Sequence, residues 1–192
     1  MKTEEWRDRL TLLLSMVALM WLVEVADRML GSWFEPDQWG IVPRQWRGLW
    51  GLLTSPFLHA DWGHLAANTV PFLVLGGLLL TRSMGQFLQV TVLVAGLGGL
   101  CVWLLGPGGT VHIGASGLIF GYFGFLLVAG LVEGSWTSLF IALGVGFLYG
   151  SLIWGVLPGE PGISWQGHLF SLLAGAFAGW GKRNREPAIR LE

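Results

Sequence analysis

The sequence predicts an all-α membrane protein with six transmembrane helices. Of its 192 residues, 53% are hydrophobic and 12% are charged, about half the charged share of a soluble domain. The charges are also segregated: they lie in the first nine residues, between Glu24 and Arg47, at a few loop positions and after Gly181. The long segments between them carry no charge, and a helix needs about 20 such residues to cross a bilayer.

Six apolar segments are the candidate spans, and the last five contain no Asp, Glu, Lys or Arg. The first is too long for a secretory signal peptide, and no small-residue cleavage pattern follows it. We expect residues 1–192 to form one membrane domain, because no linker or low-complexity stretch divides the chain. The predicted spans are residues 10–30, 65–80, 84–105, 116–132, 136–157 and 165–180.

Basic residues predict the orientation, because Lys and Arg concentrate on the cytoplasmic side of membrane proteins. Six spans place both termini on the same side as the second and fourth loops. That side carries eight of the eleven basic residues, so we expect cytoplasmic termini and a location in the cell (inner or plasma) membrane. The eight are Lys2, Arg7, Arg9, Arg82, Lys182, Arg183, Arg185 and Arg190.

The first loop, residues 31–64, is the only long one and faces outside. Its stretch from Trp46 to Leu53 is rich in Trp and Leu, which indicates short helices lying in the membrane interface. Near the end of the first span, Glu24 and Arg28 are four residues apart, which favours an ion pair within the helix.

Small residues recur at helical spacing in the later spans. Such stripes let helix backbones approach closely in a membrane, and they predict that the fourth and sixth helices are neighbours. The stripes are Gly117 and Gly121 on the fourth span, Gly146 and Gly150 on the fifth, and Ser171, Gly175 and Gly179 on the sixth.

Polar residues at membrane depth are candidates for function, because burying them in lipid is costly. Five such residues lie at the outer ends of their spans or just before them, so three helices bring polar groups to one level. A further histidine, His112 in the third loop, is expected only to lie at the interface. The five are His59, His64, Asn68, Ser116 and His168.

Ser116 lies between Gly114 and Gly117, at a predicted junction of loop and helix. The free N–H groups at a helix start favour a developing negative charge. His168 is the best-placed base for this serine, and because neither span contains an acidic residue, a Ser–His dyad fits better than a triad. The short fourth and sixth spans would leave a water-holding cavity above their ends. The residues alone leave open whether this is a hydrolase site or small-residue packing.

The sequence resembles the rhomboid intramembrane proteases over essentially its whole length. Trp46-Arg47 resembles the Trp-Arg of that family's first loop, and His59, His64 and Asn68 match its second-helix motif. The Gly-Ala-Ser-Gly run at residues 114–117 matches its nucleophile motif. His168 followed by Gly175 matches its sixth-helix motif. Each motif is weak alone, but all of them in this order on six spans are highly specific.

The resemblance implies a six-helix rhomboid-like bundle with an outer interfacial first loop. It also implies that Ser116 is the nucleophile and His168 the general base. The oxyanion donors would be His64, Asn68 and the backbone of Ser116 and Gly114. Substrates would be membrane-anchored proteins, cut near the outer end of a transmembrane segment. The supporting residues would be Phe120, His59, Gly117, Trp46 and Arg47.

Three positions depart from the family pattern. Phe120 stands where a Tyr often packs on the histidine, so the ring is kept and the hydroxyl is lost. Ser171 replaces the first glycine after the histidine, which predicts a looser contact between the fourth and sixth helices. Gly167 replaces an alanine, with little expected effect.

The main alternative is a rhomboid-like pseudoprotease that binds transmembrane clients without cleaving them, although such proteins are expected to lack the Ser or the His. We expect no cofactor and no metal, since the zinc-peptidase signature HExxH is absent. The formal net charge of −1 leaves no basic face for nucleic acid. The expected partners are the lipid bilayer and transmembrane protein substrates.

Overall fold

The computed structural model describes residues 3–33, 35–159 and 162–183, and every regular element in these ranges is helical. An isolated antiparallel pairing between Ile41 and His112 joins the first loop to the third. The helices are α1 (Thr3–Leu30), η1 (Gly31–Trp33), η2 (Pro36–Trp39), η3 (Trp46–Leu49), α2 (Gly51–Thr54), η4 (Ser55–Phe57), α3 (Trp62–Arg82), α4 (Met84–Leu93), the π-helical turn η5 (Val94–Gly98), α5 (Gly99–Leu105), α6 (Ser116–Val132), α7 (Trp136–Tyr149), η6 (Gly150–Val156) and α8 (Trp165–Trp180).

The six ranges expected from the sequence fall on helical segments, with some ends moved. α1 begins at Thr3 rather than residue 10, and α3 begins at Trp62 rather than residue 65. The third range is α4, η5 and α5 in succession, and the fifth is α7 followed by η6. Four segments are long and apolar enough to cross a membrane, and α6 is apolar but shorter. The four are residues 4–30, 62–82, 84–105 and 136–156.

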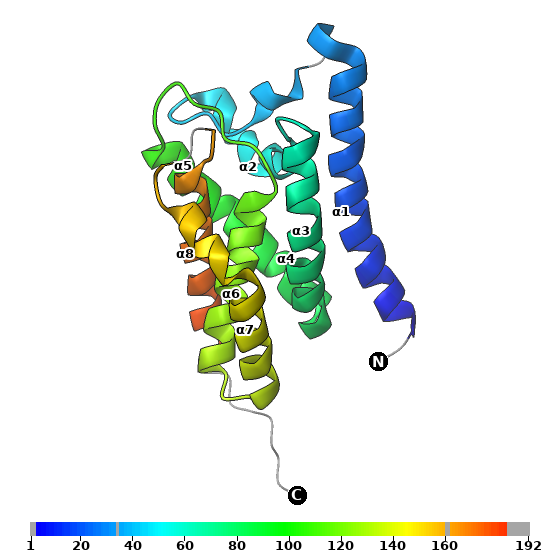
Figure 1. Cartoon of the computed structure of the whole chain (residues 1–192), viewed down its shortest axis with the longest axis vertical. Helices are drawn as coiled ribbons and strands as arrows, with labels where there is room; N and C mark the ends of the chain where they lie inside the picture. Colours follow the sequence, from blue (N-terminus) through cyan, green and yellow to red (C-terminus); the bar gives the residue numbers. More distant parts are fainter. Residues whose placement is uncertain (1–2, 34, 160–161, 184–192) are drawn as a thin grey trace, which may run out of the picture.

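The helix α6 is the centre of the bundle. It packs most extensively against α8, and also against α7 and α3. Its residues from Leu118 to Leu126 are buried without a break, as expected for a helix that is apolar on every side. By contrast, α1 stands at the edge of the bundle beside α3 (Figure 1).

The predicted contact between the fourth and sixth spans is confirmed, and glycines set its distance. A Cβ atom on Gly175 would lie 1.8 Å from the carbonyl oxygen of Gly121, so α6 and α8 touch backbone to backbone. The stripe on α7 behaves differently. A Cβ on Gly146 would make only an ordinary contact at 3.5 Å, and one on Gly150 would meet open space. The packing interpretation therefore holds for α6 and α8 and is wrong for α7.

The outer end of α1 is tied to the start of α3. Arg28 Nε donates to Glu24 Oε1 at 2.8 Å, which confirms the expected ion pair, and a second nitrogen of Arg28 donates to the Ala60 carbonyl at 2.6 Å. One helical turn before Glu24, Trp21 Nε1 donates to Thr69 Oγ1 at 3.2 Å. These contacts hold the edge helix against the segment that carries His59 and His64.

The first loop contains the expected short helices, and it is folded tightly on itself. Cβ atoms on Gly48 and Gly51 would lie 2.4 Å and 2.3 Å from backbone atoms of Val42 and Gly40, so only glycine fits at either position. Trp46 and Trp50 are 83% and 70% exposed on this loop.

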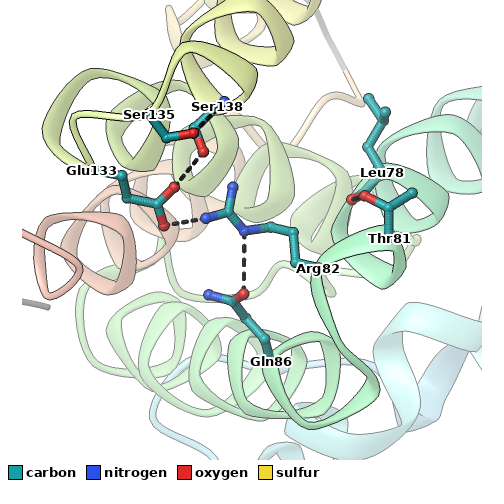
Figure 2. Close-up of polar contacts among 7 residues, drawn as sticks. All are labelled: Leu78, Thr81, Arg82, Gln86, Glu133, Ser135 and Ser138. Carbon is teal, nitrogen blue, oxygen red and sulfur yellow. Dashed lines mark hydrogen bonds and ion pairs between the residues drawn. The ribbon is translucent and has the colours of Figure 1, made fainter. Parts of the chain in front are cut away.

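The bundle has two distinct ends. We call the end where α6 begins the site end; α1 begins and α8 ends near the other, the opposite end (Figure 1). At the opposite end Arg82 forms an ion pair with Glu133 and donates to Gln86 Oε1 at 3.2 Å, and Ser138 Oγ donates to Glu133 Oε2 at 2.6 Å (Figure 2). Of the basic residues used to predict orientation, Lys2, Arg185 and Arg190 lie outside the described residues.

Candidate active site

Ser116 is the first residue of α6, at the loop-to-helix junction that the sequence predicts. The turn before it depends on Gly114, whose φ of +114° lies in the region that side chains disfavour. A Cβ on Gly114 would also lie 2.8 Å from the His64 ring. The glycine therefore lets the chain turn sharply and lets an imidazole from α3 lie against the backbone next to the serine.

His168, in the first turn of α8, contacts this serine directly. Its Nε2 lies 2.8 Å from Ser116 Oγ, and its Nδ1 lies 2.9 Å from the Gly155 carbonyl oxygen. Since a carbonyl can only accept, we assign the ring proton to Nδ1. Nε2 is then left as an acceptor for the Ser116 hydroxyl, which is the arrangement that a general base needs.

Gly155 is a contributor that the sequence did not reveal. Besides accepting from His168, it leaves room for the Phe120 ring, because a Cβ there would lie 2.8 Å from Phe120 Cζ and 3.3 Å from His168 Nδ1. Phe120 stacks on the imidazole with ring centroids 4.0 Å apart and planes 7° apart. A backbone carbonyl thus orients the histidine, and such a group has no signature in a sequence.

His64 and Asn68 lie in the first two turns of α3, as expected. Asp61 caps this helix by accepting from the His64 backbone N–H at 2.9 Å. Asn68 is 7% exposed, and its buried Nδ2 has no protein partner among the described residues. A buried amide donor without a partner is uncommon, and it calls for an explanation.

His59 supports the backbone of the serine loop. Its Nε2 accepts from the Ala115 N–H at 3.4 Å, and its ring meets the His64 ring edge-on, with centroids 5.1 Å apart. Burial lowers the pKa of His59 to about 4, so the ring is neutral near pH 7 and can act as an acceptor. His59 therefore connects the two segments that carry Ser116 and His64.

A cavity of about 50 Å³ lies beside the serine. It is larger than the 10–15 Å³ or so that one water molecule requires. Ser116, Ser164, His168, Ser171 and His112 give it polar walls. The site end of the bundle therefore has room for water next to the Ser116 hydroxyl.

Of the expected site residues, Gly114, Ser116, Gly117 and His168 line this cavity and the other six do not, whereas His112 lies closer to it than expected. Trp46 lines a separate apolar groove of about 550 Å³, and the side chain of its neighbour Arg47 is exposed. His112, expected only at the interface, is 7% exposed and lines the cavity. The interface prediction for His112 is wrong, because the first loop folds over it and pairs with its backbone through Ile41.

A family model for the rhomboid domain matches residues 46–185, which include every element of the site. The chain belongs to the rhomboid family. An uncharacterized protein of Mycobacterium tuberculosis is 44% identical over 187 residues, 93% of this chain and 77% of the relative. Rhomboid-like protein 11 of Arabidopsis thaliana (chloroplastic) is 40% identical over 86 residues, which are 44% of this chain and 29% of the relative. A Bacillus subtilis protein provisionally named a rhomboid protease is 34% identical over 90 residues, which are 46% of this chain and 43% of the relative.

This rhomboid is an integral membrane protein. Its membership of the rhomboid domain family and its four long apolar helices both indicate this. In the described part of the chain, no group of three or more His, Cys, Asp or Glu side chains is arranged to hold a metal ion. The chemistry available at the site is that of a hydroxyl, its imidazole partner and nearby hydrogen-bond donors.

The departures from the family pattern have visible consequences in this rhomboid. Phe120 keeps the stacking on His168 without a hydroxyl. Ser171 does not separate α6 from α8: its hydroxyl lies in a groove left by Gly98 and Gly117, where added Cβ atoms would come within 2.8 Å and 3.2 Å of it. The serine thus adds a polar group to the cavity without holding the helices apart.

Proposed function

We propose that this rhomboid is an intramembrane serine endopeptidase with Ser116 as nucleophile and His168 as general base. The observation that supports this most directly is the 2.8 Å contact between Ser116 Oγ and His168 Nε2, with the other ring nitrogen held by Gly155. An interaction that only stabilised the helix pair would not need an imidazole whose acceptor nitrogen points at a hydroxyl.

In the acylation step, Ser116 Oγ attacks the carbonyl carbon of the substrate peptide bond while its proton passes to His168 Nε2. The carbonyl oxygen becomes an oxyanion, which accepts from Asn68 Nδ2, from the His64 ring and from the Ser116 backbone N–H. The C–N bond then breaks, and the leaving amine takes the proton from His168. Ser116 is left as an ester of the substrate.

In the second step a water molecule from the cavity gives its proton to His168 and attacks the ester. Ser116 Oγ leaves and takes that proton back, which restores the free enzyme. Gly114 is not among the proposed oxyanion donors, although the resemblance implied it, because its N–H already donates to the Ser55 carbonyl at 2.9 Å. Its role is to shape the turn.

The membrane arrangement belongs to the same proposal. We take the six helical segments as six spans of one domain, with both termini in the cytoplasm and the site end near the outer face of the cell membrane. The first loop lies in the outer interface. Substrates are membrane-anchored proteins, which reach Ser116 through the bilayer and are cut near the outer end of a transmembrane segment.

The test is labelling of the detergent-solubilised protein with a fluorescent fluorophosphonate, which reacts with activated serines. We expect the wild type to be labelled, and Ser116→Ala and His168→Ala to be unlabelled while melting at the wild-type temperature. Lys182→Gln, at the opposite end, serves as a matched control that should be labelled normally. A folded wild type that is not labelled would contradict the proposal and favour client binding without cleavage.

A further inference from the structure

His112 is a buried histidine that the proposed reaction does not use. Its backbone exchanges two hydrogen bonds with Ile41 of the first loop, at 2.9 Å and 3.0 Å. Its ring nitrogens lie 2.9 Å from Thr110 Oγ1 and 2.5 Å from Ser164 Oγ. The residue therefore joins the first loop, the third loop and the residue that precedes α8.

The direction of each hydrogen bond follows from its neighbours. Thr110 Oγ1 donates its proton to the Pro107 carbonyl at 2.8 Å, so it can only accept from His112 Nε2. On the other side, Ser164 Oγ accepts from the Gly167 N–H at 3.2 Å, which leaves its own proton for His112 Nδ1. Thr110 therefore places a proton on Nε2, and because burial lowers the pKa of His112 the ring is neutral and its Nδ1 accepts from Ser164.

Ser164 is the N-cap of α8, and His168 follows it by one helical turn. A cap hydroxyl fixes the first turn of a helix by satisfying a free N–H group. The cap is also closely packed, because a Cβ on Gly167 would lie only 2.6 Å from Ser164 Oγ. The rotation of the Ser164 side chain thus affects the part of α8 from which the imidazole reaches Ser116.

We propose that His112 is a positioning residue, which orients the Ser164 cap and thereby fixes His168 relative to Ser116. The inference rests on the proposed serine-protease function. Its physical reason is the tolerance of the reaction, since a shift of about 1 Å in a reacting group can slow a reaction roughly 10²-fold. His112 connects α8 to the same loop that carries Gly114, so one residue sets both sides of the hydrogen bond between His168 and Ser116.

The first test compares two pairs of variants by their rate of fluorophosphonate labelling at a series of probe concentrations. His112→Phe keeps the ring shape without nitrogens, whereas His112→Asn keeps an acceptor near the position of Nδ1. Ser164→Ala removes the cap hydroxyl, and Ser164→Thr keeps it. We expect the maximal rate to fall roughly tenfold in His112→Phe and Ser164→Ala, with little change in the half-saturating concentration. His112→Asn and Ser164→Thr should recover most of that rate.

The matched control is Ser83→Ala, which removes the N-cap of α4 at the opposite end, where Ser83 Oγ accepts from the Gln86 N–H at 3.0 Å. It is the same kind of loss on a helix that carries no proposed site residue, so the labelling rate should stay at the wild-type value. A fall as large as that in Ser164→Ala would mean that the effect is one of general stability, and it would overturn the inference.

Nitrogen NMR of histidine-labelled protein supplies a readout that does not depend on activity. We expect His112 to be neutral with its proton on Nε2, and His168 to hold its proton on Nδ1 against Gly155. The His168 Nδ1–H signal should broaden or move in Ser164→Ala and remain in Ser83→Ala. A proton on Nδ1 of His112, or an unchanged His168 signal in Ser164→Ala, would overturn the inference even if His112→Phe fails to fold.

The two proposals fail in different ways. If the folded wild type is not labelled, the protease function fails, and the NMR experiment still decides whether His112 and Ser164 hold His168. If the wild type is labelled and Ser116→Ala is not, but Ser164→Ala and His112→Phe react at the wild-type rate, the function stands and the positioning role of His112 is refuted.

Discussion

The polar side chains at the two ends of this rhomboid differ in charge and in hydrogen bonding. At the opposite end, the charges of Arg82 and Glu133 are paired with each other, and Gln86 and Ser138 bond to them (Figure 2). At the site end the polar side chains that line the cavity are serine hydroxyls and histidine imidazoles, and on α3 the buried Asn68 Nδ2 has no protein partner within the described part of the chain.

On the proposed function, this difference separates a structural cluster from a catalytic one. Burying a donor without a partner costs about 1–3 kcal/mol, so stability alone would favour an apolar residue at position 68. A paired and hydrogen-bonded set of charges holds helices together, whereas a buried donor without a partner adds nothing to stability; in the proposed reaction it would bind the substrate oxygen.

Among variants of the two polar clusters, the largest expected effect is at Asn68. Asn68→Leu keeps the approximate volume and removes the free donor, so labelling and proteolysis should fall about 10²–10³-fold. Stability should stay the same or rise, because a buried unpaired group is replaced by an apolar one. Labelling kinetics and thermal unfolding in detergent, measured on the same samples, check the expected loss of activity and the expected unchanged or higher stability. A variant that loses stability together with activity would show that Asn68 is a structural residue.

The next effect is a dependence of stability on pH through His59. The folded pKa of about 4 lies below the usual 6.5, so unfolded chains bind a proton first as the pH falls. The stability that neutral His59 provides is complete above pH 6.5 and is lost as the pH falls toward 4, by an amount on the order of 3 kcal/mol. His59→Gln, which keeps an acceptor but does not titrate, should lack this loss.

The quantity to measure is the difference between wild type and His59→Gln in the free energy of unfolding, at several pH values between 4 and 7. Asp37 titrates in the same range with the opposite sign, because burial raises its pKa to about 6. Its contribution is present in both proteins and cancels in the difference. Parallel curves for the two proteins would contradict the buried, neutral state of His59.

A smaller effect is expected at the opposite end. Arg82→Met and Glu133→Gln should each lower the free energy of unfolding by about 2 kcal/mol, less than for a fully buried pair because both side chains are 16% exposed. The double variant should lose less than the sum, since the two residues act as one unit. Labelling per folded molecule should not change; a fall in the labelling rate would mean that the two clusters are coupled.

The sequence predicted much of the fold because membrane helices follow simple rules of length and polarity. Apolar runs located the helical segments, and glycine spacing correctly predicted that α6 and α8 touch. The same spacing was misleading on α7, where Gly146 and Gly150 face little or nothing. α7 does pack on α6, but the close approach is made at Gly130 of α6, against Ala142 and Ser138, and not along the glycines of α7.

The roles of the predicted site residues stay predictions, but part of their geometry follows the sequence. Ser116 contacts His168, the His64 ring lies against Gly114, and Asn68 is buried one turn after His64 on α3. The Gly155 carbonyl was missed because any residue could supply it. His112 was missed because its burial depends on the pairing of its backbone with Ile41, a contact between loops that leaves no periodic pattern in the sequence.

The smallest effect is expected at Ser171, and Gly175 one turn later provides the contrast. Ser171→Gly should change the labelling rate less than about threefold, because the spacing of α6 and α8 is set at Gly175 and not at Ser171. Gly175→Ala should abolish labelling, since its Cβ would lie 1.8 Å from the Gly121 carbonyl oxygen and would force the helices apart. If Ser171→Gly instead loses most of its labelling, the hydroxyl is more than a tolerated substitution, and the water in the cavity depends on it.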